Sequence, residues 1–148
     1  MFLNILVGVD GSPSSQRALE IAIELARAGN AKLTAMTVAP PVSTYVPLAG
    51  VSPERMSADL DRWAADMLNE AARSAPEDVN VGRVQARGHP GPEIEKELKR
   101  GGYDLVVLGT RGRGRAQEGL LGSVNGYLHF HTHVPLLSVP DDEPERTD

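Results

Sequence analysis

The chain of 148 residues contains no cysteine. Disulfide bonds, thiolate nucleophiles and cysteine-bound metal ions are therefore excluded from any account of its function. The chain also has no apolar run as long as a membrane span, and its apolar start, MFLNILVGVDG, lacks a basic leader and breaks at Asp10. These absences argue against a signal peptide and a membrane helix. We therefore expect a cytoplasmic protein that does not bind membranes.

The negative charge is concentrated at the C-terminal end. The formal net charge is −5, and the last eight residues, DDEPERTD, hold five acidic residues and one arginine, which leaves a net charge of −1 for residues 1–140. A nearly neutral body gives no support for a nucleic-acid-binding surface. The acidic segment has no apolar residue to bury. Residues 141–148 are therefore predicted to be a disordered tail after a single domain of residues 1–140.

Two apolar patterns alternate along the chain. Helical spacing, with Ser-Pro starts at Ser12-Pro13 and Ser52-Pro53, predicts four helices that begin near residues 13, 53, 90 and 123. Short runs of branched residues predict five strands, at residues 5–9, 32–38, 79–87, 104–108 and 134–139. This alternation predicts an α/β fold: a doubly wound, Rossmann-like, five-stranded parallel sheet sandwiched by four helices.

Two turns of the predicted sheet are candidates for a ligand site. In such sheets, ligands bind at the carboxyl ends of the strands, near the point where the strand order reverses. The turn at Asp10 follows the first strand, and the long loop Gly109–Val124 follows the fourth. If these two strands are neighbours, both segments lie on one rim of the sheet.

The long loop, GTRGRGRAQEGLLGSV, combines glycine with positive charge. Its glycines allow close backbone approach and positive φ. Ser123 is placed to cap a helix whose first N–H groups would face an anion, and the arginines add charge. A phosphate group would suit this combination. The composition is equally consistent with a surface loop whose arginines are solvated.

Known phosphate motifs narrow the choice. The sequence lacks the G-x4-G-K-[ST] of a P-loop, and Gln117 occupies the third glycine position of a would-be G-x-G-x-x-G. It has instead the spacing G-x2-G-x9-G-S, formed by Gly109, Gly112, Gly122 and Ser123. Together with ILVGVDGS near the N-terminus, DLVVLG before the loop and the final VPLLSV, this spacing resembles the nucleotide-binding branch of the universal stress protein family over residues 3–139.

The resemblance implies an adenine nucleotide alpha-hydrolase-like fold with a site for ATP. Asp10 would meet the ribose hydroxyls, and Gly8 and Val9 would line the adenine side. The backbone of Val38 would pair with adenine. Simpler explanations exist for two of these residues, because Asp10 could hold an Asx turn and Val38 could belong to the core.

The resemblance also implies how the phosphates would be held. Glycines early in the loop would give the backbone room near the ribose and phosphates, and amides and a hydroxyl at the loop's end would hold the β- and γ-phosphates. Arg111 would screen the phosphate charge, and Asn125 would touch the terminal phosphate or its metal. For the serine alone, a helix cap is an equally good explanation. The implied ligand is ATP, or another adenine nucleotide, with Mg²⁺ or Mn²⁺. In chain order, the residues to which the resemblance gives these ribose, phosphate and metal contacts are Gly109, Arg111, Gly112, Gly122, Ser123, Val124 and Asn125.

Nothing in the sequence indicates a dedicated enzyme. Glu118 in the loop has no identifiable partner, and of His129, His131 and His133 only the first and last would share a helix face. We predict no catalytic residue and no protein-bound metal site. The favoured function is a nucleotide-binding regulator of stress responses. A slow ATPase in the same pocket and a nucleotide-free dimeric scaffold are the alternatives.

The last predicted strand, VPLLSV at residues 134–139, is apolar and would lie at a sheet edge. An uncovered apolar edge tends to pair with another chain. The resemblance implies a homodimer through antiparallel pairing of this strand, with Pro135 limiting the register. Trp63 and Tyr127 could belong to such an interface, but core packing is the simpler assignment for both, and His89 is assigned to a loop.

Overall fold

The computed structural model describes residues 1–44, 50–110 and 123–141. Five parallel strands form one sheet in the order β3-β2-β1-β4-β5, so the first and fourth strands are neighbours. The predicted doubly wound α/β fold is confirmed. The strands are β1 (Asn4–Gly8), β2 (Lys32–Ala39), β3 (Val81–Arg87), β4 (Leu105–Gly109) and β5 (Leu136–Val139), and the helices are α1 (Pro13–Gly29), α2 (Pro53–Ser74), α3 (Pro90–Gly101) and α5 (Ser123–His131).

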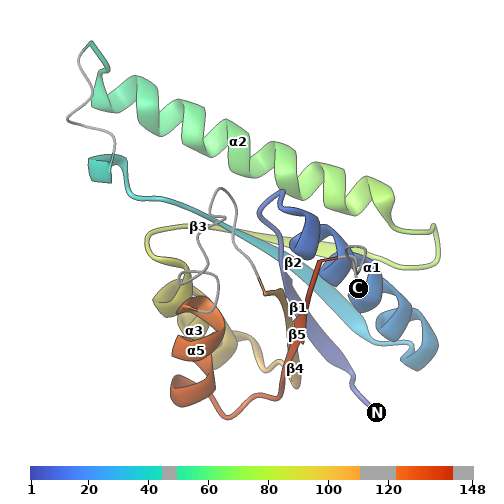
Figure 1. Cartoon of the computed structure of the whole chain (residues 1–148). Coiled ribbons are helices and arrows are strands. Elements are labelled where there is room, and N and C mark those ends of the chain that lie inside the picture. Colours follow the sequence, from blue (N-terminus) through green and yellow to red (C-terminus); the bar gives the residue numbers. More distant parts are fainter. Residues whose placement is uncertain (45–49, 111–122, 142–148) are drawn as a thin grey trace, which may run out of the picture.

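Helices cover both faces of the sheet (Figure 1), with α1 and α2 on one face and α3 and α5 on the other. Successive residues of β1 point to opposite faces. Ile5 and Val7 join the core formed with α1 and α2, and Leu6 joins the core formed with α3 and α5. Burial on both faces explains why the central strands are continuous apolar runs instead of alternating ones.

Two serine caps start helices where the sequence predicts them. The Ser12 hydroxyl accepts a hydrogen bond from the Ser15 N–H at 3.2 Å, and Ser12 precedes α1. The Ser52 hydroxyl accepts one from the Arg55 N–H at 3.1 Å, and Ser52 precedes α2. Each cap satisfies one of the N–H groups that a helix start leaves without a backbone partner.

Two strands are shorter than predicted. The β3 strand begins at Val81 and not at Val79, because the Val79 N–H is used in a turn to the Pro76 carbonyl at 3.0 Å. The β5 strand begins at Leu136 and not at residue 134. Pro135 before it has no N–H to donate, although its carbonyl accepts the Val106 N–H at 2.9 Å. The loop after β2, predicted without periodicity, contains a short 3-10 helix, η1 (Val42–Thr44).

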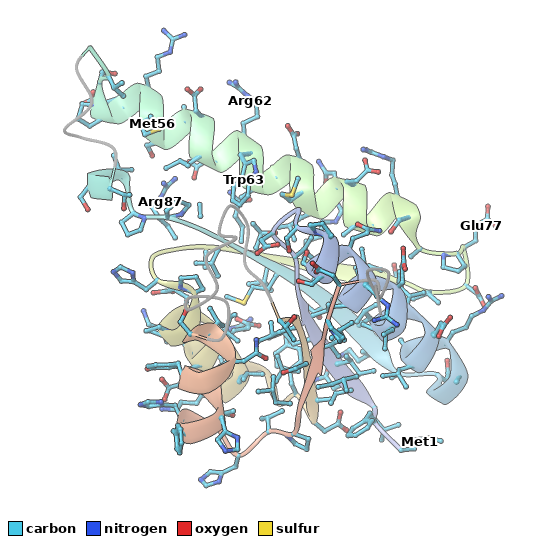
Figure 2. The ribbon with its side chains drawn as sticks, in the orientation of Figure 1. Met1, Met56, Arg62, Trp63, Glu77 and Arg87 are labelled. Atoms are coloured by element: carbon cyan, nitrogen blue, oxygen red, sulfur yellow. The ribbon has the colours of Figure 1, made fainter. Side chains whose placement is uncertain are left out.

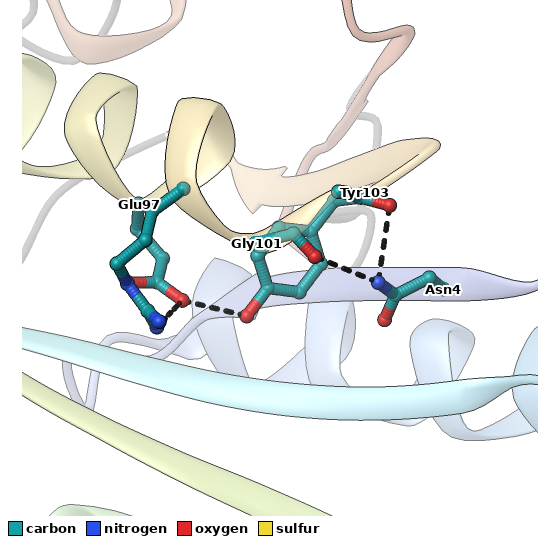
Figure 3. Close-up of polar contacts among 6 residues, drawn as sticks. Asn4, Glu97, Gly101 and Tyr103 are labelled. Carbon is teal, nitrogen blue, oxygen red and sulfur yellow. Dashed lines mark hydrogen bonds and ion pairs between the residues drawn. The ribbon is translucent and has the colours of Figure 1, made fainter.

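Polar contacts close the amino ends of β1 and β4 (Figure 3). The Asn4 side chain donates hydrogen bonds to the carbonyls of Gly101 and Gly102, each at 3.1 Å. The Asp104 carboxylate accepts the N–H groups of Leu3 and Asn4 at 2.9 and 3.0 Å. These two backbone hydrogen bonds hold the pKa of Asp104 below its usual range. The chain before β1 is thereby attached to the segment between α3 and β4.

A buried carboxylate lies beside this closure. Glu97 is only 6% exposed and forms an ion pair with Arg100 at 2.6 Å. It also accepts a hydrogen bond from the Tyr103 hydroxyl at 2.8 Å. Burial, followed by this hydrogen bond, raises the pKa of Tyr103. A buried charge requires such partners, so the three side chains act as one structural unit at this end of the sheet.

Candidate functional site

A cavity of about 430 Å³ lies at the carboxyl ends of β1, β2 and β4. This is where the strand order reverses, since β2 and β4 flank β1 on opposite sides. Eight residues singled out in the sequence line it: Gly8, Val9, Asp10, Val38, Gly109, Ser123, Val124 and Asn125. The other three, Arg111, Gly112 and Gly122, lie outside the described residues. The fold thus brings the Asp10 turn and both ends of the long loop to one place, while the roles of these residues toward a ligand stay predictions.

The turn after β1 is fixed by hydrogen bonds on both sides of Asp10. The Asp10 carboxylate accepts the Ser12 N–H at 2.9 Å, which is an Asx turn. The Asp10 N–H donates to the Ser15 hydroxyl at 3.0 Å. The Thr37 hydroxyl donates to the carbonyl of Val9 at 2.9 Å. The backbone on both sides of Asp10 is thus held from α1 and from β2, and the carboxylate itself is held by the Ser12 N–H at the cavity rim.

Gly109 ends β4 directly against the first turn of α1. A Cβ atom at this position would lie 2.4 Å from the Ser14 hydroxyl oxygen and 2.7 Å from the Ser15 nitrogen. Real Cβ atoms do not come this close to backbone, so the packing of β4 on α1 requires glycine here. This requirement holds with or without a ligand, and it is a second reason for a glycine that the family resemblance assigned to ligand approach.

Asn125 joins three elements around the cavity. Its side-chain nitrogen donates to the Gly109 carbonyl at 3.1 Å, and its side-chain oxygen accepts a hydrogen bond from the Ser138 hydroxyl at 2.5 Å. The start of α5 is thus attached to the ends of β4 and β5. These bonds give Asn125 a structural role besides the predicted contact with a terminal phosphate.

Ser123 and Val124 begin α5 at the other wall of the cavity. Ser123 is exposed, and Val124 is partly buried against the core formed by α3 and α5. The first N–H groups of a helix carry partial positive charge and lack intrahelical partners. This wall can therefore offer backbone donors to a negatively charged group.

The cavity lining also contains residues that the sequence did not assign to a ligand site, and Trp63 and His89 are the two with large ring side chains. Trp63, assigned to the core, is partly buried on α2 and lines the cavity. His89, assigned to a loop, is the N-cap residue of α3, makes no side-chain cap hydrogen bond, and also lines the cavity. The sequence contained one signal for Trp63. It is the only large aromatic residue on the face of α2 that also carries the small or apolar buried residues Ala64, Leu68 and Ala71.

The described part of the lining carries little charge. It has one carboxylate, from Asp10, one imidazole, from His89, and no lysine or arginine. Most of the other lining side chains at the β2 side are apolar: Met36, Val38, Pro40, Pro41 and Trp63. The site therefore suits a ligand with a large uncharged part.

His131 of α5 has its partners away from the cavity. The His131 ring stacks on Tyr127, with centroids 3.8 Å apart, and its Nδ1 lies 2.7 Å from the Tyr127 carbonyl oxygen. The Tyr127 hydroxyl donates to Glu95 at 2.6 Å, which lowers the pKa of Glu95. Tyr127 also packs against the core of α3 and α5, as predicted. Within residues 1–44, 50–110 and 123–141, no group of three or more histidine or acidic side chains is arranged to hold a metal ion.

The fold and the cavity together define a class: a doubly wound α/β protein with a cavity at the switch point of a parallel sheet, where ligands bind in such folds. None of the helices in the described parts of the chain is both long and apolar enough to cross a bilayer. The chain belongs to the universal stress protein family, whose sequence model matches residues 1–140.

Relatives of known name and structure agree with this assignment. The universal stress protein YxiE of Bacillus subtilis is 32% identical over 147 residues, which cover 94% of this chain and 99% of the relative. The structure of the universal stress protein UspA from Lactobacillus plantarum is 27% identical with a TM-score of 0.75, over 93% of this chain and 97% of that one. A universal stress protein solved in complex with cAMP is 26% identical with a TM-score of 0.60, over 93% and 96% of the two chains.

Proposed function

We propose that the protein binds ATP, or another adenine nucleotide, in the cavity and works as a cytoplasmic regulatory module of stress responses. The observation that carries this proposal is the meeting of four separate segments at one cavity: the Asp10 turn, the end of β2, the end of β4 and the start of α5. The family relative solved with cAMP supports an adenine nucleotide as the class of ligand.

The geometry suggests an orientation for the nucleotide. The ribose would lie at Asp10, whose carboxylate can accept hydrogen bonds from two hydroxyl groups. The base would lie toward Val38 at the end of β2. The phosphates would lie toward Ser123 and the first N–H groups of α5, where the helix dipole favours negative charge. From the sequence motif, Arg111, Gly112 and Gly122 would complete this end.

The metal would come with the nucleotide. Mg²⁺ in nucleotide sites is usually held by phosphate oxygens, water and one or two protein side chains. In the described lining, Asp10 is the only carboxylate and Asn125 offers one amide oxygen, already bonded to Ser138. This donor set fits a Mg²⁺ or Mn²⁺ ion held mainly by the phosphates.

The test is to denature freshly purified protein and identify any released nucleotide by chromatography, and then to titrate emptied protein with Mg-ATP by calorimetry. Gly122→Val, in the motif, should abolish binding because a branched side chain would block the backbone's approach to phosphate. Gly126→Val is the matched control, because a Cβ at Gly126 meets nothing within 4 Å. We expect the control to bind as the wild type does.

Each outcome decides between functions. Nucleotide bound by the wild type and the control, but not by folded Gly122→Val, supports the proposal. A following time course of ATP and ADP distinguishes a regulator that keeps its ATP from a slow ATPase. If the wild type releases no nucleotide and gives no heat with Mg-ATP, the nucleotide site is wrong and the dimeric scaffold becomes the better explanation.

We also propose a homodimer through residues 134–139. The β5 strand is an edge strand that pairs with β4, and Leu137 on it is 36% exposed. A partner strand would cover this apolar edge. Light scattering should give twice the monomer mass for the wild type, and Leu137→Lys should shift the mass toward that of a monomer. A wild type that is monomeric at micromolar concentration would contradict this proposal.

A further inference from the structure

The cavity has two chemically different ends, set by the strand order. On the β4 side, Ser123 and Asn125 supply polar groups. On the β2 side, most of the lining side chains are apolar, with Thr44 and His89 as the polar exceptions, and β1 separates the two sides. Two strand spacings amount to about 10 Å. The cavity therefore suits an elongated ligand with a charged part at one end and a flat apolar part at the other.

Trp63 reaches the apolar end from α2. Figure 2 shows Arg62 on the outer side of this helix and Trp63 on the side that faces the sheet. The helix packs mainly on β2 and β3, so Trp63 lies at the β2 side of the cavity. It is the only tryptophan of the chain. An indole in a cavity wall offers a broad apolar contact to a flat ligand.

Arg87, at the end of β3, fixes this wall. Its guanidinium donates a hydrogen bond to the Ser57 carbonyl at 3.2 Å and forms an ion pair with Asp61, both on α2. A third hydrogen bond, at 3.5 Å, reaches the carbonyl of Pro40 just after β2. The α2 segment before Trp63 and the chain after β2 are thus attached to one side chain. A wall fixed in this way loses little conformational entropy when a ligand binds.

We propose that Trp63 contacts the base of the bound nucleotide and makes the site select ligands that carry an aromatic ring over ring-free phosphates. This inference rests on the proposed nucleotide site. Contacts between bases and aromatic side chains depend little on the identity of the base, because every base has a π-face. Trp63 therefore selects nucleotides as a class and leaves the choice among bases to other groups.

The test uses Trp63 itself as the probe. Wild-type protein is titrated with Mg-ATP, with AMP and with Mg-tripolyphosphate, and calorimetry and tryptophan emission are recorded in parallel. We expect ATP and AMP to change the emission saturably, with the same Kd as calorimetry gives, and tripolyphosphate to leave it unchanged. Trp63→Leu should bind ATP about ten-fold more weakly, and Trp63→Phe within about three-fold of the wild type. Arg62→Leu, on the outer side of α2, is the matched control and should bind normally.

The outcomes separate this contact from the site as a whole. If ATP binding gives heat but no change in emission, or if Trp63→Leu binds ATP as the wild type does, the contact is wrong and the nucleotide site stands. An emission change with tripolyphosphate equal to that with ATP also overturns the contact. If Mg-ATP and AMP both give neither heat nor emission change, the proposed function fails and this inference fails with it. Should Trp63→Leu not fold, the wild-type emission comparison alone decides.

Discussion

Replacing Gly109 by alanine tests the closest packing contact at the site. The added Cβ would lie 2.4 Å from the Ser14 hydroxyl oxygen, 2.6 Å from the Ser14 carbonyl carbon and 2.7 Å from the Ser15 nitrogen. Favourable separations are about 3.5 Å or more, so β4 and α1 would have to move apart by about 1 Å. Two of the three atoms belong to the backbone of a helix that is capped and buried at this point. They cannot give way by a side-chain rotation.

The expected cost is at the upper end of that for overpacking, about 3 kcal/mol. With a typical urea dependence for a small domain, the midpoint of unfolding should fall by about 1 to 2 M. The measurement is urea unfolding followed by circular dichroism. Gly126→Ala is the control, because its Cβ meets nothing within 4 Å and a glycine-to-alanine change within a helix stabilises by up to about 1 kcal/mol.

A midpoint for Gly109→Ala within about 0.3 M of the wild type would refute this reasoning, because it would mean that α1 adjusts without cost. The experiment also separates the two explanations for this glycine. If the variant is destabilised as expected, packing on α1 is sufficient to explain why the position holds glycine. If the variant is fully stable and yet fails to bind ATP, close approach of the ligand is the better explanation.

Three further changes probe polar contacts. Tyr103→Phe removes the 2.8 Å hydrogen bond to buried Glu97 and should cost about 1 to 2 kcal/mol, seen as a lower Tm in calorimetry; an unchanged Tm would contradict the bond's importance. The pKa of Asp104 is lowered in the folded state, so its contribution to stability is present above the unfolded pKa and is lost as the pH falls through the folded one. The difference in unfolding free energy between the wild type and Asp104→Asn should therefore be constant near neutral pH and should shrink below about pH 4. A difference that persists in acid would contradict this pH dependence. Ser138→Ala removes the hydrogen bond to the Asn125 side-chain oxygen and should lower the free energy of unfolding by about 0.5 to 1 kcal/mol. Amide hydrogen exchange at the start of α5 should become faster, and unchanged exchange would contradict this prediction.

Much of the fold could be predicted because its signals are local. The apolar runs of β1 and β4 are buried on both faces and leave little ambiguity about the strands. The serine caps before α1 and α2 are visible as Ser-Pro pairs. Strict alternation of elements then limits the topology to a few parallel sheets. The strand ends near Pro76 and Pro135 were misplaced because the turns there depend on which N–H groups are available, and β1 and β4 were each placed one residue out of position.

The candidate site was predictable in part, for a different reason. The glycines and the acidic residue that follow strands indicated a ligand site at the carboxyl edge of the sheet, and the fold brings the segments that carry them together as expected. Helical periodicity placed Trp63 on the inner side of α2, but it could not tell whether that side meets core or cavity. The difference depends on how α2 lies over the sheet, and that position depends on contacts between residues distant in the sequence, such as the hydrogen bond from Arg87 to the Ser57 carbonyl. For Gly109, spacing alone could not separate packing on α1 from approach of a ligand.

Contacts at the amino end of the sheet lie far from the proposed binding site. The Asn4 contacts with Gly101 and Gly102 lie at the amino end of β1, and Gly8 lies at its carboxyl end in the cavity lining. Four residue steps along a strand span roughly 13 Å. Effects of changes at sites so far apart, with no shared partners, usually add. It follows that Tyr103→Phe should lower the free energy of unfolding and leave the affinity of the folded protein for ATP unchanged. A clear loss of ATP affinity in this variant, measured by calorimetry well below its Tm, would mean that the sheet transmits strain from one end to the other.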